Sequence, residues 1–307
     1  MTRIQTIERK SRHSADDLLA LEIPGQILAT DFYLDGAESW DLVPGGLSHP
    51  SIDVISVDHH APLPSMQRRV SSTNLVLTRL EAGLVPDKTS DAVVINHMDC
   101  DSVLASGILV GHLEPDPAYG EAAIAADHTG EENPVADLLQ GLDAHWSRNQ
   151  RPMPDPDGLE FFFDSLSRFQ SGHSMDPFAS EAMDVRKASR DRAARIVAEG
   201  RFHAETGVNL ARLEEPLEGE LLLPFLRDAV LVVTVSRHRQ RPDRWQVKVR
   251  LGLGAPEGLS LQALGIEHFD VAYGGRWNAG SNNRGGGTDL DPESYRQRLV
   301  EAVAKAQ

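Results

Sequence analysis

Short apolar runs alternate with amphipathic segments along the first half of the chain. Residues 52–57 (IDVISV), 92–95 (AVVI) and 122–126 (AAIAA) are apolar, and acidic or histidine side chains follow each run within a few positions. Each run predicts a buried strand whose carboxyl end carries polar groups. Segments 75–82 and 102–113 space their apolar residues three and four positions apart, which predicts helices. This alternation predicts an α/β domain with a mostly parallel sheet.

The second half begins with a long helical pattern. Asp176 is a predicted N-cap, Pro177 occupies the first helical position and Gly200 closes the helix. Residues 229–236 and 245–253 then alternate as two strands of a hairpin. A glycine-rich stretch follows, and the chain ends in an amphipathic helix that Asp291 caps.

These patterns divide the chain into three predicted parts. Residues 1–175 form the metal-binding catalytic domain, and residues 176–212 form a connecting helix and linker, with the segment from Leu213 (LEEPLEGE) as the transition. Residues 213–307 form a smaller α/β domain with a mixed sheet, which would bind the substrate.

The composition is that of a folded, water-soluble protein. The chain has 307 residues, of which 40% are hydrophobic and 25% charged, enough for two domains with real cores. No run approaches the ~18 apolar residues of a membrane span, and the polar start lacks an apolar signal core. Cys100 is the single cysteine, which fits a reducing compartment, so we expect a cytoplasmic location.

Charge is distributed unevenly. The formal net charge is −16, yet residues 230–307 hold eleven Lys and Arg against eight Asp and Glu. The acidity therefore lies with the predicted catalytic domain, where bound cations would offset part of it. A long duplex would need a broader basic face, so a short phosphorylated substrate is favoured.

The polar residues at the predicted strand ends form three clusters. They are Asp58-His59-His60, His97-Met98-Asp99-Cys100-Asp101 and Asp127-His128. In a parallel sheet these ends face one crevice, where ligands bind. Carboxylates and imidazoles gathered there would repel one another without cations, and hard divalent metals such as Mn²⁺ accept this mixed ligand set. The clusters therefore predict a two-metal hydrolytic centre.

The clusters resemble the motifs of the DHH phosphoesterase superfamily, which is named for the tripeptide at Asp58-His59-His60. The segment HMDCDSVLASGILVGHL from His97 is similar to the family's first motif, and IAADHTG is similar to its lone bridging aspartate, here Asp127. The Ser71-Ser72-Thr73 turn is similar to the one that opens the family's next helix.

The order of the motifs differs from that of the family. There the first motif and the lone aspartate precede DHH, whereas here DHH comes before His97-x-Asp99-x-Asp101. Either the domain is permuted or the motifs are assigned differently. A permuted parallel sheet would still bring the carboxyl ends of these strands to the same edge. The fourth motif is open: Asp31 is one candidate, Asp35 a weaker one, and Asp99 a third.

The C-terminal third resembles the DHH-associated domain. Its signature is a strand bearing an arginine, here within VKVRLG at 247–252, followed by Gly-Gly-His-x-x-Ala, in which Arg276 replaces the histidine. Glycine-rich backbone can approach phosphate closely, and arginine can bind it with two hydrogen bonds. Trp277 either stacks on a base or packs structurally. The implied substrate-binding residues are Arg250, Gly274, Gly275, Arg276, Asn278 and Arg284.

The resemblance also implies roles at the centre. His60 would contact the phosphate, and Asp58 would orient the histidines. Asp127 would bridge both ions, and His128 would be a polar neighbour; Asp101 could instead cap a helix, and Asp31 could be a plain turn residue. The metal ligands would be His59, His97, Asp99, Asp101, Asp127 and Asp31.

These residues predict a Mn²⁺-dependent phosphoesterase with two ions, Mg²⁺ being an alternative. The predicted reaction is hydrolysis of a phosphodiester in a short single-stranded oligonucleotide or linear dinucleotide, and a homodimer is left open. Two alternatives remain. One is a DHH-superfamily inorganic pyrophosphatase, whose Ser-Arg-Lys-Lys-Gln is faintly similar to residues 236–240 (SRHRQ). The other is a non-catalytic nucleotide- or nucleic-acid-binding protein.

Overall fold

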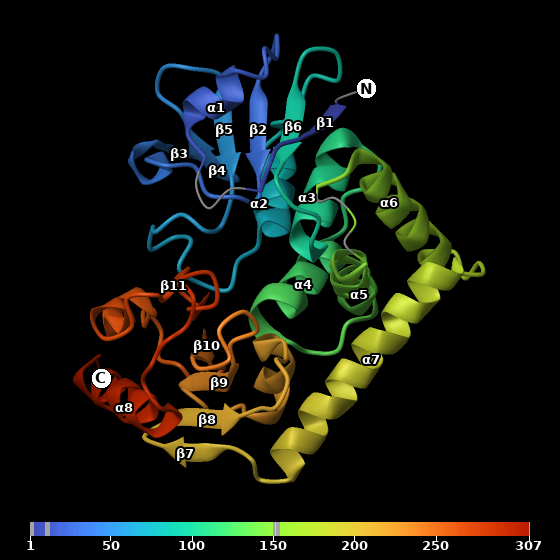
Figure 1. Ribbon diagram of the computed structural model, residues 1–307. Coiled ribbons are helices and arrows are strands. Elements are labelled where there is room, and N and C mark those ends of the chain that lie inside the picture. The colour runs from blue at the N-terminus through green and yellow to red at the C-terminus, as the bar shows by residue number, and fades with distance from the viewer. Residues whose placement is uncertain (1–2, 10–12, 150, 152–153, 307) are drawn as a thin grey trace. The chain divides into compact units, whose positions relative to one another are not determined.

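The computed structural model describes residues 3–9, 13–149, 151 and 154–306, which form two compact units (Figure 1). The first unit comprises residues 1–127 and 132–187, and the second comprises residues 128–131 and 188–307. Each unit has its own six-stranded sheet and its own buried apolar core. The predicted α/β class, with two sheets, is therefore confirmed.

The sheet of the first unit is mostly parallel. Its strands lie in the order β1-β6-β2-β5-β4-β3, and β1, β6, β2 and β5 are parallel, while β4 and β3 form an antiparallel edge. The strands are β1 (Arg3–Thr6), β2 (Ile27–Thr30), β3 (Asp41–Val43), β4 (Gly46–Ser48), β5 (Val54–Val57) and β6 (Ala92–Ile95).

Strand β2 is the centre of this sheet and explains where a site can form. Every residue of β2, β5 and β6 is buried, as expected for parallel strands covered on both faces. β2 pairs with β5 on one side and with β6 on the other. The chain thus leaves β2 in one direction and later returns to its opposite flank, which makes the carboxyl end of β2 a topological switch point.

Helices α2 and α3 pack against this sheet, and α3 is buried along its whole length. Both predicted helices are confirmed, with starts set by side-chain caps. Ser71 and Asn74 form a capping box at α2, and Asp99 accepts from the Ser102 amide at α3. The helices are α1 (Ala15–Leu19), α2 (Ser72–Glu81), α3 (Cys100–Val110), α4 (Pro117–Ile124), α5 (Pro134–Arg148), α6 (Pro156–Gln170) and α7 (Pro177–Ala198).

The predicted strand at residues 122–126 is wrong. Helix α4 covers this run up to Ile124 and continues into a π-helical turn, η2 (Ala125–Thr129). The run contains four alanines and one β-branched residue, and alanine is the strongest helix former, so local propensity favours the helix. Asp127 therefore comes from a wide helical turn and not from a strand end.

The second unit has a mixed sheet in the order β11-β12-β10-β9-β8-β7, in which only the β8–β9 pair is parallel among the described residues. The predicted hairpin is confirmed as β9 and β10. The elements are β7 (His203–Glu205), β8 (Val208–Arg212), β9 (Leu231–Arg237), β10 (Trp245–Leu251), β11 (Gly274–Gly275), β12 (Ala279–Ser281) and α8 (Pro292–Ala306), with 3₁₀ turns at Gly219–Phe225, Gln262–Leu264 and Ile266–His268.

The region between the sheets differs from the sequence-based division. Helix α7 begins after Asp176, with Pro177 first, as predicted. The boundary between the two units falls inside this helix, after Lys187. Residues 203–212 form β7 and β8 of the second sheet, and residues 213–218 only connect β8 to the next 3₁₀ turn. Within the described residues, no helix has the length and apolar character needed to cross a membrane.

Candidate metal centre

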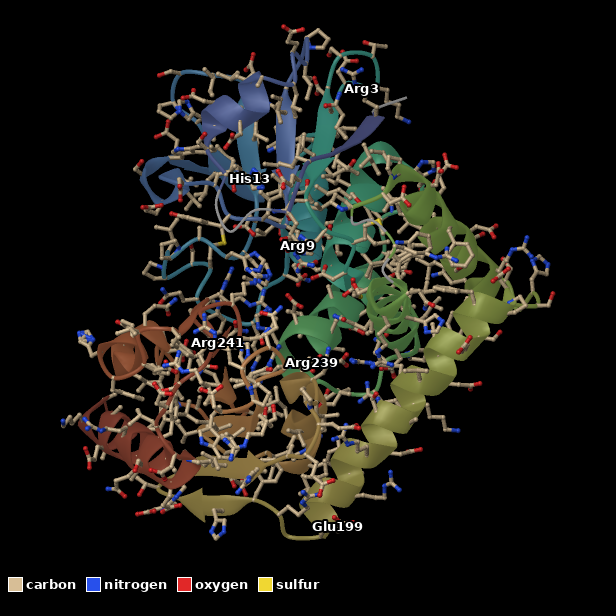
Figure 2. The ribbon with its side chains drawn as sticks, in the orientation of Figure 1. Arg3, Arg9, His13, Glu199, Arg239 and Arg241 are labelled. Atoms are coloured by element: carbon tan, nitrogen blue, oxygen red, sulfur yellow. The ribbon has the colours of Figure 1, made fainter. Side chains whose placement is uncertain are left out.

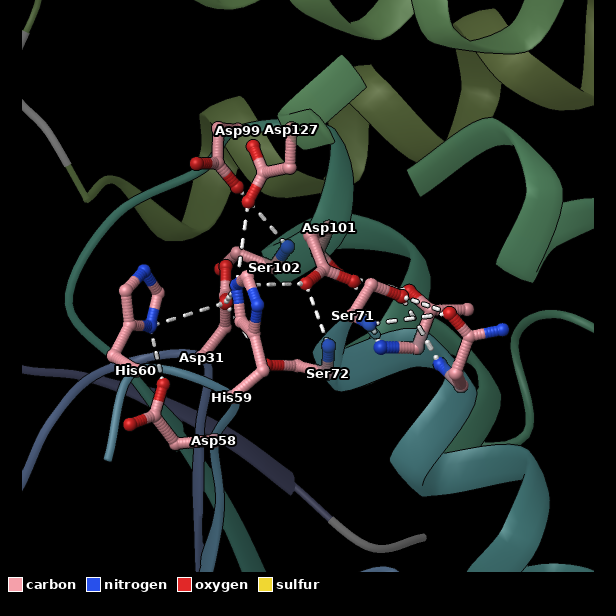
Figure 3. A network of polar contacts seen from close by, with 12 residues as sticks. Asp31, Asp58, His59, His60, Ser71, Ser72, Asp99, Asp101, Ser102 and Asp127 are labelled. Atoms are coloured by element: carbon pink, nitrogen blue, oxygen red, sulfur yellow. Dashed lines mark hydrogen bonds and ion pairs between the residues drawn. The ribbon is translucent and has the colours of Figure 1, made fainter. Parts of the chain in front are cut away.

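The carboxyl ends of three parallel strands bring the predicted residues together (Figure 3). Asp31 follows β2, the Asp58-His59-His60 tripeptide follows β5, and His97 follows β6 by two positions. Because these strands are adjacent and parallel, their ends meet at one edge of the sheet. All of these residues belong to the first unit.

Asp31 lies between two groups of ligand atoms. Its Oδ1 is 3.6 Å from His59 Nε2, and its Oδ2 is 3.3 Å from His97 Nε2. Its backbone has a φ of 62°, uncommon for a residue other than glycine, while its amide still donates to Val57 O at 3.0 Å. Such strain is concentrated at functional sites, and here it turns the side chain across the strand ends.

Three overlapping groups of side chains could each hold a metal ion. They are Asp31 with His97 and Asp99, His59 with Asp101 and Asp127, and Asp31 with His59 and His60; the ligand atoms of each group lie within 4.8 Å of one another. His97 Nε2 is 3.1 Å from Asp99 Oδ2, and His59 Nε2 is 3.3 Å from Asp127 Oδ2. Among the described residues, Asp31 is the only carboxylate that occurs in two of these groups, and His59 links the third group to one of them.

Asn96 fixes the orientation of His97. The Asn96 Oδ1 atom is 2.6 Å from His97 Nδ1, so that nitrogen carries the proton that it donates to the amide oxygen. The other ring nitrogen, Nε2, then faces Asp31 and Asp99. Ser102 Oγ also donates to the His97 carbonyl at 2.7 Å. Outer partners of this kind hold metal-binding histidines in position.

The first turn of α2 holds Asp101. The amides of Ser72 and Thr73 donate to its two carboxylate oxygens, both at 2.7 Å, and Thr73 Oγ1 adds a bond of 2.6 Å. A helix N-terminus stabilises a carboxylate through these free N–H groups and its dipole. Ser72 Oγ also donates to Asp31 Oδ1 at 2.9 Å, so the same turn positions both aspartates.

Asp58 orients His60 from below the centre. The Asp58 carboxylate is fully buried and hydrogen-bonds to His60 Nδ1. Burial raises the pKa of Asp58, but the imidazole of His60 outweighs it and leaves that pKa below its usual value. His60 itself is half-buried, and its ring packs against that of His59 with centroids 4.3 Å apart.

The electrostatics of the cluster favour a cation. Burial, with the nearby Asp101 and Asp99, raises the pKa of Asp31 well above its usual value, and burial also raises the pKa of Asp101. Asp31 Oδ2 is buried and accepts no hydrogen bond. The centre thus combines several buried carboxylates, one of which has an oxygen without a hydrogen bond, with neighbouring imidazoles. This combination is a suitable set of ligand atoms for a hard divalent metal. The residues therefore fit the predicted ions.

The geometry bears on the roles assigned from the sequence. We expected Asp127 to bridge both ions and left Asp31 open, and the bridging role of Asp127 stays a prediction. Asp31 lies between His59 and His97, and Asp127 lies with His59 and Asp101. Asp35 is exposed and belongs to none of the groups. Asp99, not Asp101, caps α3. In chain order the centre reads Asp31, the DHH tripeptide, His97-x-Asp99-x-Asp101 and Asp127. Along the sheet the order differs, because β6 and β5 flank β2, and Asp127 comes from the helical turn η2.

The predicted substrate-binding residues belong to the second unit and have different surroundings. Arg250 is mostly buried and pairs with Glu220 at 3.2 Å, so its charge is already balanced. Asn278 is buried with its Nδ2 atom 3.1 Å from His128 Nδ1, and Trp277 packs on the same imidazole. Gly274 and Gly275 form the exposed strand β11, Arg276 is half-buried and Arg284 is exposed.

Sequence reasoning missed three roles that the structure shows. Asn96 was not singled out, although it directly precedes His97, and the Ser72 and Thr73 turn was noted without its function of holding Asp101. An amide beside a candidate histidine and hydroxyl residues opening a helix were the available signals. Neither pattern indicates which side chain the residue contacts. Ser72 meets Asp101, for example, only because α2 packs on α3.

Comparisons with known proteins give fold-level likenesses only. No known family model matches the chain, and no curated protein matches it in sequence. A pGpG-specific phosphodiesterase, PggH, from Vibrio cholerae is 11% identical, with 92% of this chain and 100% of that chain covered at a TM-score of 0.47. An exopolyphosphatase-related protein from Bacteroides fragilis is 11% identical, with 99% and 92% covered at a TM-score of 0.36. The functional argument therefore rests on the residues of the centre.

Proposed function

We propose that this protein is a metal-dependent phosphodiester hydrolase acting on short oligonucleotides or linear dinucleotides. The observation that carries the proposal is the position of Asp31, whose carboxylate lies between His59 on one side and His97 on the other. A carboxylate shared by two ligand groups is the arrangement that a pair of closely spaced ions requires. The resemblance of the motifs to DHH phosphoesterases supports the same chemistry.

Each of the two ligand groups is held in place by a neighbouring residue or turn that is not itself a proposed ligand. In the proposal His97, Asp99 and Asp31 hold one ion, and His59, Asp101 and Asp127 hold the other. Asp31 would also serve the second ion, because its Oδ1 lies 3.6 Å from His59 Nε2. Bound divalent ions would supply Lewis-acid activation of water and would neutralise charge on the phosphate. Asn96 keeps His97 Nε2 directed at its ion, and the α2 turn holds Asp101 in place by donating three hydrogen bonds.

His60 is the proposed phosphate contact. Asp58 binds its Nδ1, which leaves Nε2 directed away from that carboxylate, and the ring is more exposed than that of His59. A proton on Nε2 would let His60 donate to a phosphate oxygen and meet the charge that develops there.

The second unit supplies the proposed substrate-binding groups. Arg276, Arg284 and the glycine backbone at Gly274 and Gly275 remain candidates, because their side chains or backbone reach solvent. Arg250 is better assigned to structure, since its partner Glu220 is itself mostly buried. The basic C-terminal region and the short glycine segments suit a small phosphorylated substrate better than a long duplex.

A length series of labelled RNA tests this function. Mn²⁺ is added to the protein with 5′-labelled single strands of increasing length, starting from the dinucleotide, and EDTA serves as the control. We expect metal-dependent release of mononucleotides, fastest on the shortest strands. Absence of cleavage at every length, together with hydrolysis of pyrophosphate, would contradict the proposal and favour a pyrophosphatase.

A further inference from the structure

One imidazole in the second unit joins two arginine-bearing loops. His238 lies in the loop between β9 and β10, and only 3% of its surface is exposed. Its Nε2 donates to the carbonyl of Asn283 at 2.9 Å, and its Nδ1 accepts from the amides of Gln240 at 3.2 Å and Arg241 at 3.1 Å. His238 therefore fixes the hairpin loop, residues 237–244, against the glycine-rich loop, residues 283–287.

The glycines bring the loops into direct contact. Gly286 and Gly287 have φ values of 88° and 75°, in the region that favours glycine. A Cβ atom on Gly286 would lie 2.7 Å from Nη1 of Arg241, and one on Gly287 would lie 3.3 Å from Cδ2 of His238. The Arg241 guanidinium thus lies directly over the glycine backbone, a placement that a side chain there would prevent.

Two of the five arginines in this region are engaged by the protein itself. Residues 237–244 and 283–289 contain five arginines against two aspartates. The guanidinium of Arg237 lies 3.7 Å from the centroid of the Trp245 ring, and Arg244 forms an ion pair with Asp289.

The other three arginines, Arg239, Arg241 and Arg284, are exposed, and no ion pair or hydrogen bond within the described residues engages their side chains. Figure 2 labels two of them, Arg239 and Arg241. We call these three the arginine rim. Arg239 and Arg241 are separated by a single residue of the hairpin loop, and Arg284 lies in the loop that His238 fixes beside it.

We propose that the arginine rim binds the phosphates of a single-stranded oligonucleotide. Guanidinium groups form paired hydrogen bonds with phosphate oxygens, and loops fixed in advance lose little entropy on binding. A protein partner would need an apolar anchor, yet the exposed large hydrophobic residues that the structure describes all lie outside these two loops. Since the whole chain has a net charge of −16, the unpaired positive charge here is local and directed at an anion.

This proposal deepens the proposed function and rests on it only for turnover. It implies a substrate with several phosphates, so that strands longer than a dinucleotide gain affinity from the rim. Arg239 and Arg241 would contact phosphates and would read no base, so affinity should fall with salt and vary little with sequence.

Binding without metal tests the rim separately from catalysis. Fluorescence anisotropy in EDTA measures the affinity of a labelled RNA pentanucleotide and a dinucleotide over a series of salt concentrations. For Arg239→Ala with Arg241→Ala we expect pentanucleotide affinity to fall about tenfold and the salt slope to shrink by about 0.7 for each arginine. Arg298→Ala, which removes an exposed arginine of α8, is the matched control and should change neither quantity.

A second variant tests whether the hydrogen bonds of His238 contribute to binding by fixing the two loops. His238→Ala keeps all three arginines but removes the hydrogen bonds that fix both loops, so pentanucleotide affinity should fall while the protein keeps its charge. Equal affinities for the wild-type protein and the double arginine variant would overturn the proposal, as would an equal loss in Arg298→Ala. Rim-dependent binding by a protein that cleaves no RNA would support the rim and contradict only the proposed function.

Discussion

Asp31 ends the central strand of the first sheet with a positive φ, and its carboxylate faces imidazoles from both flanking strands. It is buried among other carboxylates, which raises the pKa of Asp31 well above its usual value. Without a cation, an ionised Asp31 therefore costs stability at neutral pH, since its pKa is higher in the folded than in the unfolded chain. With cations present, the same charge becomes the common ligand.

Asp31→Asn should consequently have opposite effects with and without metal. In EDTA the melting temperature should rise, because a buried charge is removed and amide hydrogen bonding remains. With Mn²⁺ at about 100 times the wild-type Kd, the variant should lack the ~2.7 kcal/mol that ligand binding adds to wild-type stability. Differential scanning calorimetry measures both, and Asp35→Asn, an exposed neighbour, should behave as wild type. A metal-dependent shift of wild-type size in Asp31→Asn would contradict its shared role.

Asn96 acts on the metal only through His97. Asn96→Ala removes the acceptor of the Nδ1 proton, so the ring can rotate or change tautomer, and Mn²⁺ affinity should fall about 10- to 100-fold. Asn96→Asp retains an acceptor at the same place and should largely restore affinity. Isothermal titration calorimetry measures both variants; equal affinities for Asn96→Ala and the wild type would show that the contact does not position His97.

At the level of single residues, the sequence predicted the members of the centre but not their roles. Histidine and aspartate at strand ends are visible in a single chain, and eight predicted residues do converge. Which carboxylate lies in the middle depends on strand order, because β2 is central only through pairing with both β5 and β6. Local spacing contains no information about that pairing.

At the level of elements, helix α2 supports the centre through its first turn. Its capping box fixes where the helix begins, and this places the amides of Ser72 and Thr73 on the carboxylate of Asp101. The starts of α7 and α8 were predicted, because the caps at Asp176 and Asp291 are local signals, whereas α2 and α3 begin two or three residues before the predicted positions. The 122–126 run was mispredicted because apolar length suggested a strand where alanine propensity favours a helix.

Thr73→Val tests the contribution of this turn. It keeps the side-chain shape but removes the hydroxyl that donates to Asp101 at 2.6 Å, so we expect a loss of about 1–3 kcal/mol in the free energy of unfolding. Thr78→Val on the same helix removes an exposed hydroxyl bonded to the Asn74 carbonyl and should cost less than about 0.5 kcal/mol. Urea denaturation compares the two variants. Equal losses in the free energy of unfolding would mean that the hydrogen bond to Asp101 stabilises the protein no more than an exposed one.

At the level of the whole molecule, metal binding and protonation are coupled. Burial lowers the pKa of His97, but Asp99 and Asp31 outweigh it and hold it well above its usual value, while the pKa of Asp31 is also raised. A cation therefore competes with protons for both groups. Mn²⁺ affinity should fall as pH is lowered from 8 towards about 5.5, and binding should release protons.

Calorimetric titrations in buffers of different ionisation enthalpy measure that proton release directly. The His97→Gln variant, which has no titrating ring, should release fewer protons. An affinity that is constant over the whole pH range would be inconsistent with competition between protons and the cation.

The sequence predicted two domains joined by a connecting segment. The residues assigned to each domain differ in part from the two units of the structure. Composition separated an acidic first part from a more basic second part, and the hairpin pattern identified the second sheet. Residues 203–212 join that sheet because β8 pairs in parallel with β9, a long-range contact without a local signature. The same limit applies to Arg250, whose partner Glu220 could not be read from spacing.

The central claim is that two cations lie on either side of the Asp31 carboxylate. Crystals grown with Mn²⁺ and measured at the manganese absorption edge would locate the ions by anomalous scattering. We predict two peaks, one beside His97 and Asp99 and one beside His59, Asp101 and Asp127, both within coordination distance of Asp31. A map with no peak beside Asp31, or with a single peak that leaves one of these groups empty, would contradict the account.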